Sequence, residues 1–182
     1  LIAHNLKASK EQILDDLKGF MSPLQRRMLK ELLQHLDELN VHIENLNDEI
    51  DNFMKPEEKQ ASQMIQDVTG IGNTSAQAII AVIGTDMERF PSDRHISSWA
   101  GLCPGDNISA KKRKGGKIRK GNALLKSTLV LCAHAAVRHK SSYFHAQFKR
   151  ISTHRGKKRA YVAVAHSILI AIYHILKDGV KY

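Results

Sequence analysis

Apolar side chains recur every three or four residues through one segment near the start of the chain. The series keeps a single narrow seam on one face of a helix, which is the pattern of a coiled coil; it runs Leu29, Leu32, Leu36, Leu39, Ile43, Leu46, Ile50, Phe53. At 1.5 Å per residue the seam extends about 36 Å. We expect homo-oligomer formation through 29–53, between copies of the chain, or else pairing with a short helix at 9–20. The alternative is one long helix packed within a monomer.

Polar and proline signals mark where these helices begin and end. A serine followed three residues later by glutamine, which forms a capping box, occurs at Ser9 and again at Ser22, where Pro23 fits the first helical position. Pro56 predicts the end of the long helix, because proline disfavours a helical conformation in the residue before it. The predicted parts are a short helix and linker at 1–22, a coiled-coil helix at 23–55 and one further domain at 56–182.

A turn between two predicted helices at 57–83 resembles the helix-hairpin-helix motif. Gly-Ile-Gly, then Ala and Ile at the expected spacing, occupy Gly70, Ile71, Gly72, Ala76 and Ile79. Glycines allow unusual backbone angles and a close phosphate, and the amides that begin the next helix donate to anions. We therefore predict phosphate-backbone contacts from Gly70, Ile71, Gly72, Asn73 and Thr74. A plain tight turn is the alternative.

The rest of the chain also favours helices. We expect a helix at 92–100 that buries Ile96 and Trp99, and further helices at 123–139, 142–152 and 160–177, the last central to the core. Aromatic residues make up 5% of the chain and hydrophobic residues 42%, which favours an aliphatic helical core over a β-sandwich. The predicted fold class is all-α, with a long coiled-coil helix before a helical domain.

Charge is unevenly distributed along the chain, whose formal net charge is +10. Residues 1–60 hold 8 Lys and Arg against 12 Asp and Glu, a net of −4, and residues 61–182 hold 20 against 6, a net of +14. Such a basic segment indicates a polyanionic partner, most often nucleic acid; a basic surface kept for solubility is the alternative. No apolar run reaches about 18 residues, so we expect no membrane span, and Cys103 and Cys132 alone make no disulfide framework.

One serine stands beside the densest basic cluster. Ser109 precedes a glycine-containing loop with Lys111, Lys112, Arg113, Lys114, Lys117, Arg119 and Lys120, where cations would bind a phosphate and stabilise charge developing on its oxygens. A second basic turn at 154–159 adds Lys157 and Lys158. By itself a loop serine is far more often a turn former than a nucleophile.

Metal chemistry finds little support in the residue types. The acidic residues of the basic half are scattered, whereas two-metal hydrolysis needs several converging carboxylates; they are Asp67, Asp86, Glu88, Asp93, Asp106 and Asp178. The 10 histidines show no zinc-like spacing with the cysteines. We predict no metal site and no cofactor in this chain.

Four sequence blocks in series carry a resemblance to a known family. They are Ile65-Gln66-Asp67-Val68-Thr69-Gly70-Ile71-Gly72, Trp99-Ala100-Gly101-Leu102-Cys103-Pro104, Ser109 with the basic residues up to Asn122, and Arg155-Gly156-Lys157-Lys158. In this order they resemble the C-terminal transposase domain of the bridge-RNA-guided, DEDD-type insertion-sequence transposases. The resemblance begins near residue 61.

The resemblance implies a DNA recombinase in which a serine, here Ser109, forms a covalent link to DNA. It further implies a RuvC-like domain with four acidic residues and Mg²⁺, a guide RNA, and a cytoplasmic, nucleoid-associated location in a bacterium or archaeon. The chain starts at Leu1 and lacks that acidic domain, so we expect a fragment that binds DNA without completing strand transfer. Family members often carry Ser-Ser-Gly-Gly-Lys where this chain has Ile108-Ser109-Ala110-Lys111-Lys112.

Two other functions fit the same residues. The first is a non-enzymatic helix-hairpin-helix scaffold for DNA, in which Ser109 is incidental. The second is a coiled-coil dimerisation protein whose basic tail binds RNA.

Overall fold

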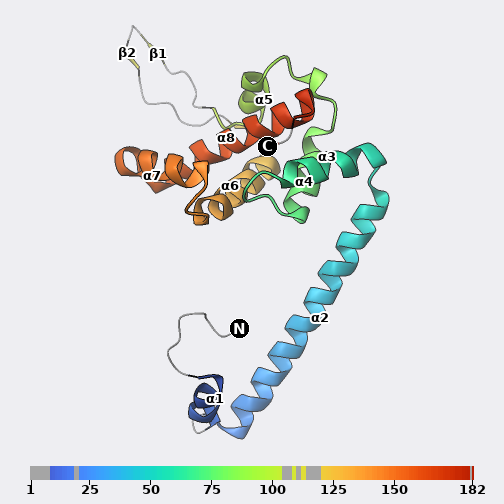
Figure 1. Cartoon of the computed structure of the whole chain (residues 1–182), viewed down its shortest axis with the longest axis vertical. Coiled ribbons are helices and arrows are strands. Elements are labelled where there is room, and N and C mark those ends of the chain that lie inside the picture. The colour runs from blue at the N-terminus through green and yellow to red at the C-terminus, as the bar shows by residue number, and fades with distance from the viewer. Residues whose placement is uncertain (1–8, 19–20, 104–107, 110–111, 114–119, 181) are drawn as a thin grey trace. The chain divides into compact units, whose positions relative to one another are not determined.

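Helices make up nearly all of the regular structure. The computed structural model describes residues 9–18, 21–103, 108–109, 112–113, 120–180 and 182, and the chain divides into two compact units, Leu1–Phe53 and Met54–Tyr182 (Figure 1). The helices are α1 (Lys10–Lys18), α2 (Pro23–Phe53), α3 (Pro56–Gln66), α4 (Asn73–Ile83), the 3₁₀ turn η1 (Met87–Arg89), α5 (Asp93–Trp99), α6 (Ala123–Arg138), α7 (Tyr143–Arg155) and α8 (Lys157–Asp178). The all-α prediction is confirmed.

The first unit begins its helices where the sequence predicts. The Gln12 amide donates to Ser9 Oγ at 3.2 Å while the Ser9 amide donates to Gln12 Oε1 at 2.9 Å, and Ser22 and Gln25 form the same reciprocal pair. These bonds satisfy amides that have no partner within the helix. α2 ends at Phe53, two residues before the lysine that precedes Pro56, in agreement with the proline signal.

The apolar seam of α2 is fully formed and uncovered. No residue of α2 is buried, and the seam side chains from Leu29 to Phe53 are 43–89% exposed. Pairing through 29–53 stays a prediction.

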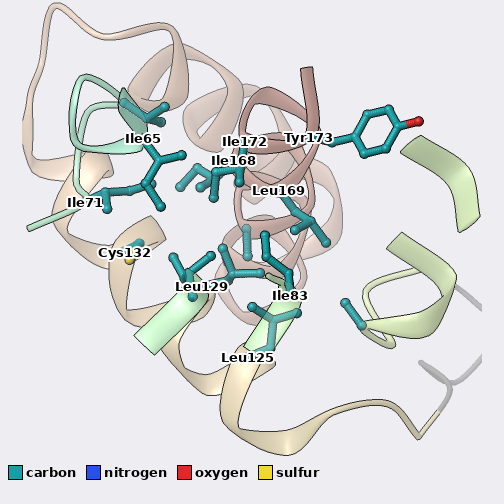
Figure 2. Close-up of a cluster of buried hydrophobic side chains, with 14 of the residues drawn as sticks. Ile65, Ile71, Ile83, Leu125, Leu129, Cys132, Ile168, Leu169, Ile172 and Tyr173 are labelled. Carbon is teal, nitrogen blue, oxygen red and sulfur yellow. The ribbon is translucent and has the colours of Figure 1, made fainter. Parts of the chain in front are cut away.

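In the second unit α8 forms the centre of the core. It packs against α3, α5, α6, α7 and η1. Figure 2 shows Ile168, Leu169 and Ile172 among side chains from α3, α4 and α6, whereas the Tyr173 ring points away from them. Tyr173 also donates its hydroxyl to the Phe90 carbonyl oxygen at 3.1 Å, which satisfies a polar atom at the edge of the core.

Two details of this unit differ from the sequence predictions. By length and composition α8 is apolar enough to cross a membrane, contrary to the expectation that no segment would be, but 44% of its most apolar window is buried inside the domain. A central core helix has this composition for packing reasons alone. The basic segment 154–159 is mostly helical rather than a turn, because α7 continues to Arg155 and only Gly156 separates it from α8.

The prediction that Trp99 is buried is wrong. Trp99 is 42% exposed and packs its ring against Phe90, with 5.5 Å between ring centroids. Ile96, Ser97 and Ala100 are the residues of this turn that reach the core. At 3.6 residues per turn, Ser97 and Ala100 lie on one side of Ile96 and Trp99 lies on the other. The sequence analysis took the side of Trp99 as the buried face, whereas the side of Ser97 and Ala100 is buried.

Candidate nucleic-acid interface

Ser109 lies in a short antiparallel hairpin. Strand β1 (Ile108–Ser109) pairs with β2 (Lys112–Arg113), and the register sets Ser109 opposite Lys112 and Ile108 opposite Arg113. The sequence predicted a loop clamp here, and the paired backbone is an ordered element that it missed. Lys111, Lys114, Lys117 and Arg119 lie outside the described residues. Lys120 is described and exposed.

The two ends of this basic segment meet at one place on the helical core. A Cβ built on Gly121 would lie 2.4 Å from the carbonyl carbon of Ala100 and 2.4 Å from the amide nitrogen of Gly101, closer than real Cβ contacts. Only glycine permits this approach. Asn122 then caps α6, and its side chain accepts a hydrogen bond from the Leu125 amide at 3.0 Å. The helix α6 therefore begins immediately after the close contact.

The predicted phosphate-binding turn joins α3 to α4. Its first two residues, Gly70 and Ile71, pack against the core, and the residues from Gly72 to Thr74 are exposed. Ile71 is buried in the core beneath it. Gly70 has a φ of +96°, and a Cβ there would lie 2.5 Å from the Cys132 carbonyl oxygen and 2.6 Å from the Ala136 amide nitrogen. The structure therefore explains Gly70 by the packing of the turn onto α6.

The outward half of the turn is open. Gly72, Asn73 and Thr74 are exposed, and a Cβ on Gly72 would meet no atom within 4 Å. Gly72 is the N-cap of α4 and supplies no side chain to its first amides. These three positions are therefore the part of the predicted set with room for a phosphate, whereas the geometry of Gly70 and Ile71 serves the core. A phosphate contact here stays a prediction.

A second cationic surface surrounds the junction of α7 and α8, which we name the α7–α8 corner. Gly156, with a φ of +80°, is the only residue between the helices. All of its basic side chains are exposed, and among the described residues none forms an ion pair with an acidic side chain; they are Lys149, Arg150, Arg155, Lys157, Lys158 and Arg159. The corner also includes the amino-terminal end of a 22-residue helix, where the helix dipole adds positive potential.

Stacked rings brace this corner against α6. The ring of Tyr161 in α8 stacks on His134 of α6 with centroids 3.6 Å apart, and Phe148 of α7 packs on Tyr161 at 4.5 Å. Since Phe148 directly precedes Lys149 in the chain, the ring contacts fix the backbone that carries the cations. The cations of the corner therefore lie on two helices that pack against each other, one of which also packs against α6.

The surrounding sequence contains no opposing charge. Between Asp106 and Asp178, residues 107–177 include 17 Lys and Arg and no Asp or Glu. The sequence analysis selected only Lys157 and Lys158 at the corner. The absence of acidic residues from 107–177 was the signal that would have identified the other four basic residues of the corner as well. Like-charge repulsion makes such a surface unfavourable unless a polyanion neutralises it.

The described residues offer no ligand set for a metal. Among them, no group of three or more His, Cys, Asp or Glu side chains converges on one point. Cys132 is buried, and burial raises the pKa of its thiol while a hydrogen bond with Ser75 lowers it. We assign no metal ligand in that part of the chain.

Residues 62–149, which run from α3 into α7, match the family described as transposase IS116/IS110/IS902. The chain therefore carries a transposase domain of this family. The resemblance drawn from the four sequence blocks is confirmed.

Two curated relatives match most of the chain. The transposase for insertion sequence element IS1111A of Coxiella burnetii is 30% identical over 124 residues, covering 66% of this chain and 34% of the relative. An uncharacterised protein of insertion element IS110 from Streptomyces coelicolor is 28% identical over 130 residues, covering 69% and 31%. The matches thus span about a third of each relative.

The match to the transposase family ends inside α7. α8 lies beyond it, although α8 is the central helix of the same compact unit. The transposase domain of this chain therefore extends structurally through α8, and the α7–α8 corner belongs to it.

Proposed function

We propose that this chain is the DNA-binding and nucleophile-bearing part of an insertion-sequence transposase. The observation that carries the proposal is the run of 17 basic and no acidic residues in 107–177, which includes both the Ser109 hairpin and the α7–α8 corner. A surface of this kind binds the phosphate backbone, and the family membership makes DNA the expected polyanion.

In this proposal Ser109 attacks a phosphodiester of DNA. A bond forms between Ser109 Oγ and phosphorus as the bond from phosphorus to one deoxyribose oxygen breaks, and that oxygen leaves with a proton. The linkage is a phosphodiester on both sides of the step, so an incoming DNA hydroxyl reverses the reaction and reseals a strand. Basic residues beside Ser109, with Lys112 opposite in the hairpin register, stabilise the charge that develops on the phosphate oxygens.

The remaining parts of the proposal follow the family resemblance. A RuvC-like domain with four acidic residues would supply Mg²⁺ and complete the site, and a guide RNA would choose the target. The protein would then act on the nucleoid in the cytoplasm of a bacterium or archaeon. Phosphate contacts from this chain carry little base information, which agrees with a target chosen elsewhere.

We also propose that copies of the chain associate through 29–53. Eight apolar side chains that face one side of α2 and remain exposed would lose their contact with water in such an assembly, which favours association by about 25 cal/mol for each Å² of apolar surface buried. Replacing Leu39 or Ile43 by Asp in the centre of the seam should therefore yield monomers in sedimentation experiments.

The test of the nucleophile uses the full-length transposase with Ser109→Ala. DNA binding should persist, because the cations remain, while a protein–DNA adduct that survives denaturation should disappear. Ser127→Ala is the matched control, since Ser127 is an exposed serine whose hydroxyl only donates to the Leu124 carbonyl oxygen of its own helix. An adduct that persists in Ser109→Ala would remove Ser109 from the reaction, because another group would then form the covalent link.

A further inference from the structure

The charges of α2 oppose the dipole of their own helix. Residues 23–35 hold three basic residues and one acidic residue, and residues 36–53 hold six acidic residues and none that is basic. No acidic side chain lies in the first turn and no basic side chain in the last. A helix has a positive amino-terminal end and a negative carboxy-terminal end, so α2 carries like charge at each end, and an isolated α2 is destabilised by both.

The seam that α2 exposes fits a two-stranded coiled coil. In heptad terms its first-core positions are Leu29, Leu36, Ile43 and Ile50, and its second-core positions are Leu32, Leu39, Leu46 and Phe53. All eight positions are apolar, and they form only a narrow stripe along the helix, which a single partner helix covers. The occupant that this seam matches along its full length is a second copy of itself.

We infer that two copies of α2 pair in an antiparallel orientation. A parallel pair would set two acidic halves side by side and add two aligned helix dipoles. An antiparallel pair sets the basic residues Arg26, Arg27 and Lys30 of each helix near the last acidic residues of the other, Asp48, Glu49 and Asp51, and opposes the dipoles. Charge complementarity therefore selects the antiparallel orientation, and this inference rests on the pairing through 29–53 proposed above.

Full overlap of the seam fixes the antiparallel register. Leu29 then packs on Phe53 of the second copy, Leu36 on its Leu46, and the pair has its centre near Val41. Every one of the eight apolar layers is filled, and none is left against water. Any shift by one heptad leaves two apolar seam residues unpaired at each end of the pair.

The orientation decides where the two transposase domains attach. Each domain follows the carboxy-terminal end of its own α2 in the chain. An antiparallel pair therefore joins the two domains at opposite ends of a seam about 36 Å long, whereas a parallel pair joins both at one end. In the inferred dimer the two Ser109 hairpins therefore belong to domains that attach at opposite ends of the paired helices.

The test measures distances between spin labels in the dimer of the whole chain. In a Cys103→Ser background, where Cys132 is buried, a single cysteine replaces Asn45 or Asn52. Both are exposed, uncharged and one heptad apart on the same face of α2, so their lateral geometry is matched. In the antiparallel register the two labels are offset along the axis by about 12 Å at position 45 and about 33 Å at position 52.

The outcomes separate the orientation from the pairing itself. A distance at position 52 that exceeds the distance at position 45 supports the antiparallel pair. Equal distances at the two positions would overturn the orientation and leave the pairing through 29–53 in place. A chain that sediments as a monomer at all concentrations would overturn both, and neither result bears on Ser109, whose adduct is measured separately.

Discussion

Gly121 lies directly against Gly101, at the point where the basic segment leaves and rejoins the helical core. The contact is so close that a Cβ on Gly121 would lie 2.4 Å from the Gly101 amide nitrogen. Gly101 is itself buried and has a φ of +70°. The two glycines therefore allow the chain just before α6 to pack against the turn that follows α5.

Replacing Gly121 by Ala should therefore lower the free energy of unfolding by about 1–3 kcal/mol, the cost of inserting one carbon into a filled site. The new carbon meets backbone atoms, which cannot rotate away. Chemical denaturation of the whole chain measures the effect. Gly72→Ser is the control, because a side chain there enters open space at an ordinary φ of −99°. Equal stability of the two variants would contradict the close contact.

Gly70→Ala should cost more than Gly121→Ala. A φ of +96° is strained for any other residue, which adds about 1–3 kcal/mol to a clash with backbone atoms of Cys132 and Ala136. We expect a total loss of about 2–6 kcal/mol in the free energy of unfolding. If Gly70→Ala instead weakened DNA binding at unchanged stability, Gly70 would serve the phosphate contact and not the packing onto α6.

Protonation of His166 should lower the free energy of unfolding in mild acid. Burial lowers the pKa of His166 below its ordinary value of 6.5, because the charged ring is poorly solvated there. The unfolded chain therefore binds the proton at a higher pH than the folded one, so stability falls as the pH drops through 6.5 towards the lower folded pKa. His166→Gln should flatten this part of a stability profile measured between pH 8 and pH 5, with pH 8 as the reference.

Asp93 should moderate the same effect. Its carboxylate acts on His166 in the opposite direction to burial and raises the pKa. Removing that charge with Asp93→Asn lowers the folded pKa further, so the loss of stability between pH 6.5 and pH 5 should become steeper. An Asp93→Asn profile with the same slope as the wild-type profile between pH 6.5 and pH 5 would show that the two groups do not interact.

Local signals made the helix boundaries predictable from sequence. The reciprocal bonds of Ser9 with Gln12 and of Ser22 with Gln25 involve residues three apart, so their geometry depends on nothing distant in the chain. The seam of α2 is similarly local, since it reports only the period of one helix. Such features can be predicted from short segments of sequence.

Features that depend on distant segments were not predictable. Trp99 looked like a core residue by its type, but the placement of α5 on α8 turned Ile96, Ser97 and Ala100 inward. Gly70 matched a phosphate-binding pattern, whereas its missing side chain makes room for α6, more than 60 residues later. In both cases the deciding neighbour belongs to another helix, which no local pattern names.

The candidate site was predictable in charge and less so in shape. Lys157 and Lys158 were recognised, but the segment around them was expected to be a turn, which hid Lys149 and Arg150 on the preceding helix. Gly156 alone makes the reversal from α7 to α8. A long helix is not expected to begin one residue after another ends, and that tight junction places the basic end of α7 directly before the basic start of α8.

Lys157→Ala and Lys158→Ala should each reduce the steepness with which DNA affinity falls as salt rises, by about one unit in the slope of log affinity against log salt for each phosphate contact removed. The loss should be similar for unrelated DNA sequences, because phosphate contacts do not read bases. Neither change should unfold the domain, since both side chains are exposed and a basic residue in the first turn of α8 opposes its dipole.

The control is Lys59→Ala, which removes the same charge beside Glu57 and Glu58 on α3. A polyanion is repelled there, so this variant should leave the slope unchanged. If all three variants shift the slope equally, only net charge matters and the corner is not a binding surface; if only the two variants on α8 shift it, the phosphate backbone lies across the α7–α8 corner.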